Sequence, residues 1–71
     1  MSHIKQGVIK VIEIIGISEK SWEDAVSQAV TKTAETVNDI TGVEVKSFTA
    51  SVEDGKVVGY KANCKIAFTV R

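Results

Sequence analysis

Hydrophobic positions follow three patterns along the chain, each typical of a different element. Residues 8–15, VIKVIEII, are almost continuously apolar, which favours a strand that is buried on both faces or lies in an assembly interface. Farther along, apolar side chains recur every three or four positions, at Trp22, Ala25, Val26, Ala29, Val30, Ala34 and Val37. This spacing predicts an amphipathic helix from about Trp22 to Asn38.

The predicted helix has a well-marked start. Ser21 can accept a hydrogen bond from a free backbone N–H group of the first turn, and Asp24, three residues later, can reach back to complete a capping box. The carboxylates of Glu23 and Asp24 also suit the positive end of the helix dipole. Alanines on the apolar stripe predict that this helix lies close against a sheet.

The segment after Gly42 predicts a β-hairpin. Asp54-Gly55 is a strong turn signal between two long strand-like stretches. In the second stretch, alternate residues are largely apolar, and we expect them to face the helix: Val58, Tyr60, Ala62, Cys64, Ile66, Phe68 and Val70. The other face is polar and carries Lys61, Lys65, Thr69 and Arg71, opposite Ser47, Thr49 and Ser51 if the register pairs them.

The element order β-α-β-β predicts an α+β fold, a three-stranded antiparallel sheet with one helix packed across one face. The 71 residues form a single domain, residues 1–71, which buries only about 60% of the surface that the unfolded chain exposes. The single Cys64 excludes an internal disulfide, and no CxxC or HxxxH spacing suggests a structural metal. Because one helix leaves a sheet face and both edges open, we predict self-association.

Charge and segment composition narrow the partners and the location. Nine basic residues balance nine acidic residues, so no large single-sign field points to nucleic acid or an anionic membrane as the main partner. The chain shows neither a secretory signal nor a run of about 18 apolar residues. With one unpaired thiol, these features predict a cytoplasmic protein.

The residues that most often carry chemistry have no catalytic arrangement in this sequence. His3 has no Asp or Ser arranged near it, and we give it no role. Cys64 lies on the apolar face of its strand and has no histidine partner to activate it, so we interpret it as a core thiol. Trp22 and Tyr60 are expected to be packing residues. No P-loop, GxGxxG, catalytic triad or zinc spacing occurs, which predicts a binding or structural protein and not an enzyme.

Carboxylates offer one further possibility. Several of them can meet across subunits and hold a hard cation such as Ca²⁺ or Mg²⁺ through oxygen ligands: Glu13, Glu44, Glu53 and Asp54. The alternative is that these side chains are solvated surface charge.

The chain resembles the dodecins over nearly its whole length. The resemblance rests on the strand VIEIIGIS, the helix SWEDAVSQAVTKTAETV, the VEV stretch after Gly42 and the closing YKANCKIAFTV. It implies a β-α-β-β subunit that assembles as twelve copies into a hollow shell. It also implies storage of a flavin, such as FMN, FAD or riboflavin, at subunit interfaces without turnover.

Three positions depart from the flavin-binding members of that family. The position matching Gly42 is a tryptophan that stacks on the flavin in those members, the position matching Lys61 is commonly a glutamine, and bacterial members often carry an arginine at Thr49. The resemblance therefore implies the shell with a weakened flavin site. The alternative is a shell without flavin that binds cations through Glu13 and Glu44 or serves as a scaffold.

Overall fold

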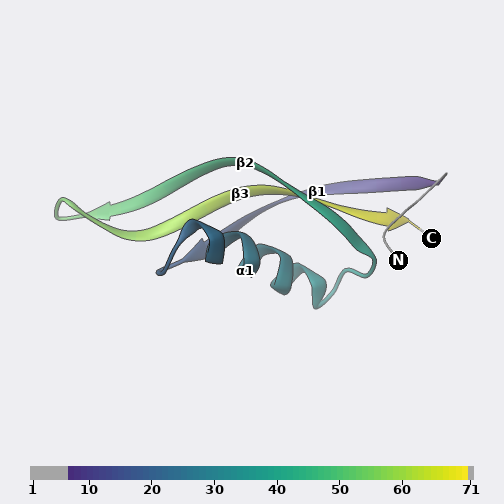
Figure 1. Ribbon diagram of the computed structural model, residues 1–71, viewed down its shortest axis with the longest axis horizontal. Coiled ribbons are helices and arrows are strands. Elements are labelled where there is room, and N and C mark those ends of the chain that lie inside the picture. The colour runs from purple at the N-terminus through teal and green to yellow at the C-terminus, as the bar shows by residue number, and fades with distance from the viewer. Residues whose placement is uncertain (1–6, 71) are drawn as a thin grey trace.

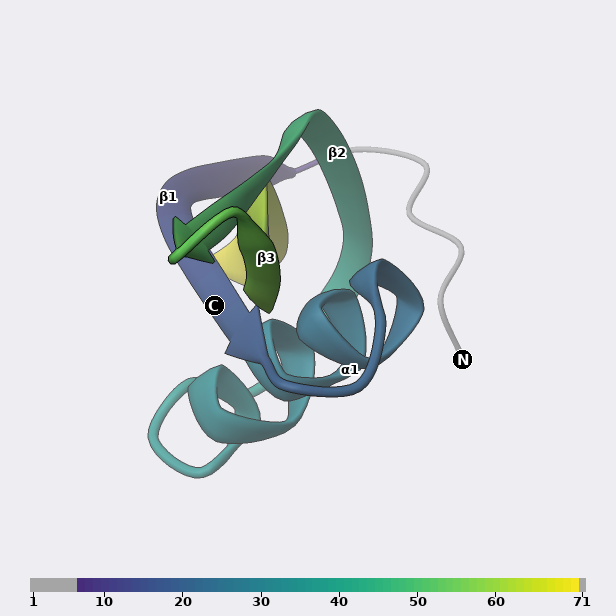
Figure 2. The ribbon, with the colours of Figure 1, turned by 90° about the vertical axis from the view of Figure 1, so that its left-hand side faces the viewer.

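The computed structural model describes residues 7–70 and has the predicted β-α-β-β order (Figure 1). Strand β1 spans Val8–Ser18, helix α1 spans Trp22–Ala34, and strands β2 and β3 span Ile40–Glu53 and Lys56–Val70. The three strands form one antiparallel sheet in the order β1-β3-β2, so β3 is central. The view along the long axis shows α1 on one side of a twisted sheet (Figure 2). His3 and Arg71, considered above, lie outside the described residues.

The start of α1 differs in one detail from the predicted capping box. The Ser21 side chain caps the helix as expected, because its Oγ accepts a hydrogen bond from the backbone N–H of Asp24 at 3.0 Å. The Asp24 carboxylate, however, accepts a hydrogen bond from the Ser18 hydroxyl at 2.6 Å. Ser18 Oγ in turn accepts from the backbone N–H of Lys20 at 2.9 Å. The buried Ser18 thus links the end of β1 to the first turn of α1.

The helix ends earlier than its apolar pattern predicted, at Ala34 instead of Asn38. The backbone N–H groups of Thr36 and Val37 both donate to the Thr33 carbonyl, so the last turn tightens and closes there. Asp39 then adopts a φ of 62°, a left-handed conformation that short polar side chains tolerate. The apolar position Val37 therefore belongs to the connection that leads into β2, and the prediction of helix as far as Asn38 is wrong.

The turn between β2 and β3 is the two-residue turn that Asp54-Gly55 predicted. Both residues have positive φ, 52° and 76°, as a type I′ turn requires. Beyond the turn, the β2–β3 register shifts at three places. One of them lies at Lys46, because Val45 pairs with Cys64 while Ser47 pairs with the next residue, Asn63. This bulge is on β2 only.

The fully buried core is small and made of small side chains: Ala25 and Ala29 of α1 with Ala62, Cys64 and Ile66 of β3. Gly16 of β1 explains how the helix comes so close to the sheet. A Cβ atom placed on Gly16 would lie only 1.9 Å from the Ala25 carbonyl oxygen. The close packing that the alanine stripe predicted therefore depends equally on a glycine in the facing strand.

Many large apolar side chains remain exposed in the single chain. On the sheet face away from α1, β1 presents an apolar strip that we call the β1 strip: Ile9, Val11, Ile15 and Ile17, each more than half exposed. On the helix side, β2 exposes Val43, Val45 and Phe48, because α1 packs mainly against β1 and β3. The open surface predicted from the sequence is thus present and strongly apolar on both sides.

Candidate functional site

The candidate residues lie on the sheet face away from α1, which we call the outer face. Ala62, Cys64 and Ile66 of β3 are buried beneath the helix, so the alternate residues Lys61 and Lys65 belong to the outer face. The register then arranges the neighbours of β3 in rows across the three strands: Val11–Ala67–Gly42, Glu13–Lys65–Glu44, Ile15–Asn63–Ser47 and Ile17–Lys61–Thr49. Of the predicted cross-strand pairs, Thr49 does lie opposite Lys61, whereas Ser47 and Ser51 lie opposite Asn63 and Gly59 on the same face.

Gly42 leaves an open position on this face. A Cβ atom built there would meet nothing within 4 Å, and its φ lies outside the range that disfavours side chains. Its partner Ala67 is also small. Neither space nor backbone conformation therefore requires glycine at this position, and a larger side chain would fit in the single chain.

Thr49 and Lys61 are direct cross-strand partners. Gly42 lies seven positions before Thr49 on the same strand, which places the two about 20 Å apart along β2. One chain therefore brings Thr49 and Lys61 together but does not bring Gly42 to them. A ligand that contacts all three positions would have to lie between copies of the chain.

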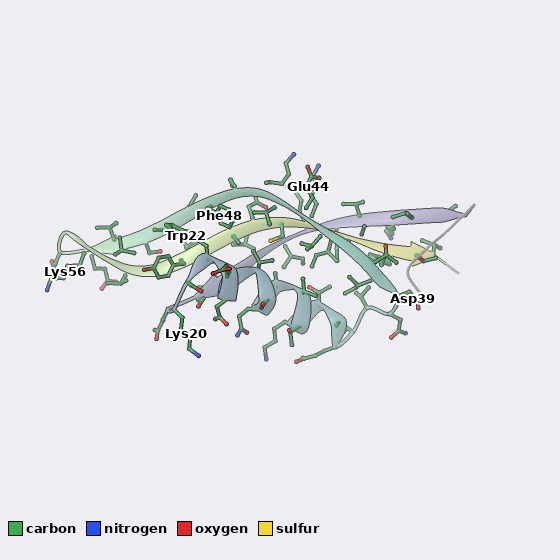
Figure 3. All side chains as sticks on the ribbon, in the orientation of Figure 1. Lys20, Trp22, Asp39, Glu44, Phe48 and Lys56 are labelled. Carbon is green, nitrogen blue, oxygen red and sulfur yellow. The ribbon has the colours of Figure 1, made fainter. Side chains whose placement is uncertain are left out.

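Glu13 and Glu44 lie in the same row, with Lys65 between them. Glu44 extends from β2 to the side opposite α1 (Figure 3). Glu53 and Asp54 lie elsewhere, at the hairpin end of β2. Within residues 7–70, no group of three or more His, Cys, Asp and Glu side chains comes together in one chain as a metal would need.

An aromatic cluster supports the Thr49–Lys61 row from the helix side. The Trp22 ring meets Tyr60 edge-on with a centroid distance of 4.9 Å and Phe48 with a centroid distance of 6.0 Å. Trp22 and Phe48 lie side by side above the first turn of α1 (Figure 3). The Trp22 indole N–H also donates to the Thr49 carbonyl at 2.8 Å. Trp22 is thus the packing residue that was predicted, and it also holds the backbone of β2 at Thr49.

Neither this hydrogen bond nor the role of the Ser18 hydroxyl at the helix start was predicted from the sequence. No local signal connects Trp22 with Thr49, which are 27 residues apart. For Ser18 the sequence offers a weak signal: a serine lies three residues before the Ser21 cap, and serines near a helix start often bond to its backbone.

Cys64 is fully buried, as its position in the apolar pattern predicted. Burial raises the pKa of its thiol above the ordinary value of 9.0, because desolvation disfavours the thiolate. The thiol also donates to the Ala62 carbonyl, with a sulfur–oxygen distance of 3.6 Å. This environment keeps the sulfur protonated and unreactive.

The family match follows from the sequence over nearly the whole described chain. The dodecin family model matches residues 8–71. The chain belongs to the dodecin family. This dodecin is 34% identical over 64 residues to the calcium dodecin of Mycobacterium tuberculosis, with 90% of each chain covered. The resemblance drawn from the sequence is therefore confirmed.

Solved dodecin structures have the same fold. The dodecin of Streptomyces coelicolor superposes with a TM-score of 0.91 at 26% identity, covering 96% of this chain and 97% of that one. The Mycobacterium tuberculosis calcium dodecin, whose crystal structure has a novel calcium-binding site, superposes with a TM-score of 0.81 at 36% identity and covers 92% and 93% of the two chains. The predicted fold class is confirmed. Among the described residues, no helix is long and apolar enough to cross a membrane.

Proposed function

We propose that this dodecin is a non-catalytic binding protein whose single-domain subunits assemble, as twelve copies in a hollow shell, to bind and store a small ligand. The observation that carries this proposal is the apolar surface left open on both sides of the sheet. The β1 strip and the exposed apolar side chains of β2 form far more apolar surface than single scattered residues would. Further copies of the chain would bury this surface and could bring Gly42 to the Thr49–Lys61 pair, from which it is separated within one chain.

A divalent cation, Ca²⁺ or Mg²⁺, is the ligand that the outer face supports best. A calcium-binding relative shares 34% of the aligned residues, and Glu13 and Glu44 offer the carboxylate oxygens that such cations prefer. Since one chain supplies too few ligands, symmetry-related copies would complete the coordination sphere. Gly42 also removes the aromatic ring on which a flavin would stack.

The first experiment combines native mass spectrometry of freshly purified protein with calorimetric titration of Ca²⁺ and Mg²⁺. We expect a twelve-subunit mass and saturable heat that weakens in Glu13→Gln and Glu44→Gln. Glu19→Gln, an exposed glutamate in the β1–α1 connection, is the matched control and should bind like the wild type. A monomeric mass, or no heat at millimolar metal, would contradict the assembly or the cation proposal respectively.

Flavin is the second candidate, because Thr49 and Lys61 lie together on the outer face and the space at Gly42 can take a ring. Loss of the stacking ring costs on the order of 1 kcal/mol or more for each contact, so we expect flavin affinity reduced by well over tenfold when two rings per flavin pair are missing. Gly42→Trp should restore tight binding in a flavin fluorescence-quenching titration, whereas Gly42→Ala should not. Equal affinity in the two variants would argue against a flavin site.

We place this function in the cytoplasm, where the free Cys64 thiol would stay reduced. Cell fractionation followed by immunodetection checks this location, and recovery of the protein in a membrane or secreted fraction would contradict it.

A further inference from the structure

One residue, Trp22, connects the start of α1 to the hairpin formed by β2 and β3. Its indole N–H donates to the Thr49 carbonyl at 2.8 Å, and its ring meets Phe48 and Tyr60 edge-on. Within residues 7–70, no other hydrogen bond joins α1 to β2, because the helix packs mainly against β1 and β3. We call these contacts of Trp22 with Phe48, Thr49 and Tyr60 the Trp22 clamp.

The hairpin continues past the helix. The paired strands β2 and β3 extend well beyond the first turn of α1 (Figure 1). The part that follows the clamp, residues 52–58, which we call the hairpin end, exposes the side chains of Val52, Val57 and Val58. Thr49 lies five residues before Asp54 of the turn, about 17 Å along the strand. Over that length a rotation of about 10° at the clamp would move the turn by about 3 Å.

Two bulges make the direction of the hairpin end depend on the clamp. One bulge leaves Lys46 of β2 outside the strand pairing, and the other leaves Val58 of β3 outside it. A regular ladder fixes the direction of a strand pair, whereas a bulge bends its strand and increases the local twist. Thr49, which the clamp holds, lies in the stretch between these two bulges. The clamp therefore fixes the hairpin between its two bends.

We propose that the Trp22 clamp sets the direction of the hairpin end and thereby decides whether the assembly of copies closes. This inference rests on the assembly proposed above, in which further copies would bury the exposed valines of the hairpin end. Identical copies form a closed particle only if the rotation between neighbours closes, and otherwise they add without limit. A displacement of about 3 Å is close to the width of an atom, which a well-packed interface cannot absorb. Trp22 is thus a positioning residue for assembly.

Hydrogen-exchange and native mass spectrometry of the full chain test the proposal. Trp22→Phe keeps an aromatic ring but removes the indole N–H, so we expect the backbone amides of the hairpin end to exchange about fivefold faster while those of β1 stay unchanged. We also expect the single twelve-subunit mass to become a mixture of masses. Phe48→Leu keeps the N–H but removes one ring contact, and should act in the same direction. Ser21→Ala is the control, because it weakens the helix start outside the clamp.

The outcomes separate this inference from the proposed function. Unchanged exchange of the hairpin end in both Trp22→Phe and Phe48→Leu, or an equal increase in Ser21→Ala, overturns the role of the clamp while the assembly stands. Faster exchange together with a single twelve-subunit mass overturns the link between the direction of the hairpin end and closure. A monomeric wild type overturns the proposed assembly and closure with it, and the exchange rates then decide only whether Trp22 positions the hairpin.

Discussion

Two glycines on the two edge strands of the sheet, Gly16 of β1 and Gly42 of β2, differ in how strongly the structure requires a glycine. At Gly16 a Cβ atom would clash with the Ala25 carbonyl oxygen at 1.9 Å, and that oxygen belongs to backbone that cannot turn aside. At Gly42 the same atom would meet nothing within 4 Å. The first glycine serves helix–sheet packing, whereas the second leaves a position on the outer face empty.

This contrast gives a matched pair of variants. We expect Gly16→Ala to lower the free energy of unfolding by about 1–3 kcal/mol, as overpacking of a tight interface does. Gly42→Ala should change it by less than about 0.5 kcal/mol. Denaturant unfolding at one fixed protein concentration measures both, since assembly would otherwise shift the midpoint. Equal effects of the two substitutions would show that α1 can move away from β1 at little cost.

The Cys64 thiol should be protected while the protein is folded. Because burial raises its pKa above 9.0, the unfolded state loses the thiol proton at lower pH than the folded state. The contribution to stability is therefore complete below pH 9.0 and declines as pH rises above that value. We expect thiol reagents to label Cys64 only in denaturant, and the stability of the wild type to fall more between pH 8 and pH 10 than that of Cys64→Ala. Rapid labelling of folded protein at pH 8 would contradict this account.

At the scale of elements, local signals decided most of the fold. The Ser21 cap, the three-to-four spacing of apolar residues and the Asp54-Gly55 turn each specify a local conformation, and each was found as predicted. The end of α1 was misjudged because Val37 continues the apolar spacing, although the chain has already left the helix at Ala34. Periodicity reports which positions are apolar, and it does not report which hydrogen bonds close the last turn.

The candidate site was harder to predict because it depends on register. If residues are paired one by one outward from the two-residue turn, Glu44 is set opposite Lys65. The structure has the same pair, because two of the register shifts cancel by that point. The same count sets Thr49 opposite Tyr60, whereas the structure sets it opposite Lys61. A shift of one residue moves a side chain to the other face, and no local residue pattern revealed where these shifts occur.

The cap of α1 allows a direct test at this scale. Ser21→Ala removes the oxygen that accepts from the Asp24 N–H, so we expect a loss of about 1 kcal/mol in the free energy of unfolding. Ser27→Ala is the control, an exposed serine inside the helix where alanine is the better helix former. Chemical denaturation followed by circular dichroism measures both. A Ser21→Ala variant as stable as Ser27→Ala would mean that Ser18 alone organises the helix start.

For the whole molecule, the apolar surface matters more than any single contact. The structure extends over 50 × 20 × 15 Å, a long shape that exposes side chains which a compact fold of this length would cover. Ile15 and Ile17 are 60% and 63% exposed. Burying an isoleucine is worth about 1.5–3 kcal/mol, and an assembly repeats this gain in every subunit.

A charge in the β1 strip should therefore prevent assembly. We expect Ile15→Lys to shift the native mass from the assembled form to monomers or small oligomers at micromolar concentration, because the interface would have to bury an unpaired ammonium group. Thr31→Lys adds the same charge on an exposed position of α1 and should leave the mass unchanged. Analytical ultracentrifugation gives the same comparison without ionisation. Full assembly of Ile15→Lys would mean that the subunit interface does not include the β1 strip.

The bulge at Lys46 also makes this point of β2 tolerant of the loss of one residue. Over this stretch, three residues of β2, Val45 to Ser47, lie opposite only two residues of β3, Cys64 and Asn63. Deleting Lys46 would shorten β2 to the length of its partner there and leave every later side chain in phase. Deleting a residue from the regular Gly59–Ala62 stretch of β3 would instead move all side chains on one side of the deletion to the opposite face of the sheet from their neighbours. The hairpin can therefore lose one residue at the β2 bulge without exchanging its two faces, whereas the regularly paired stretch of β3 opposite cannot.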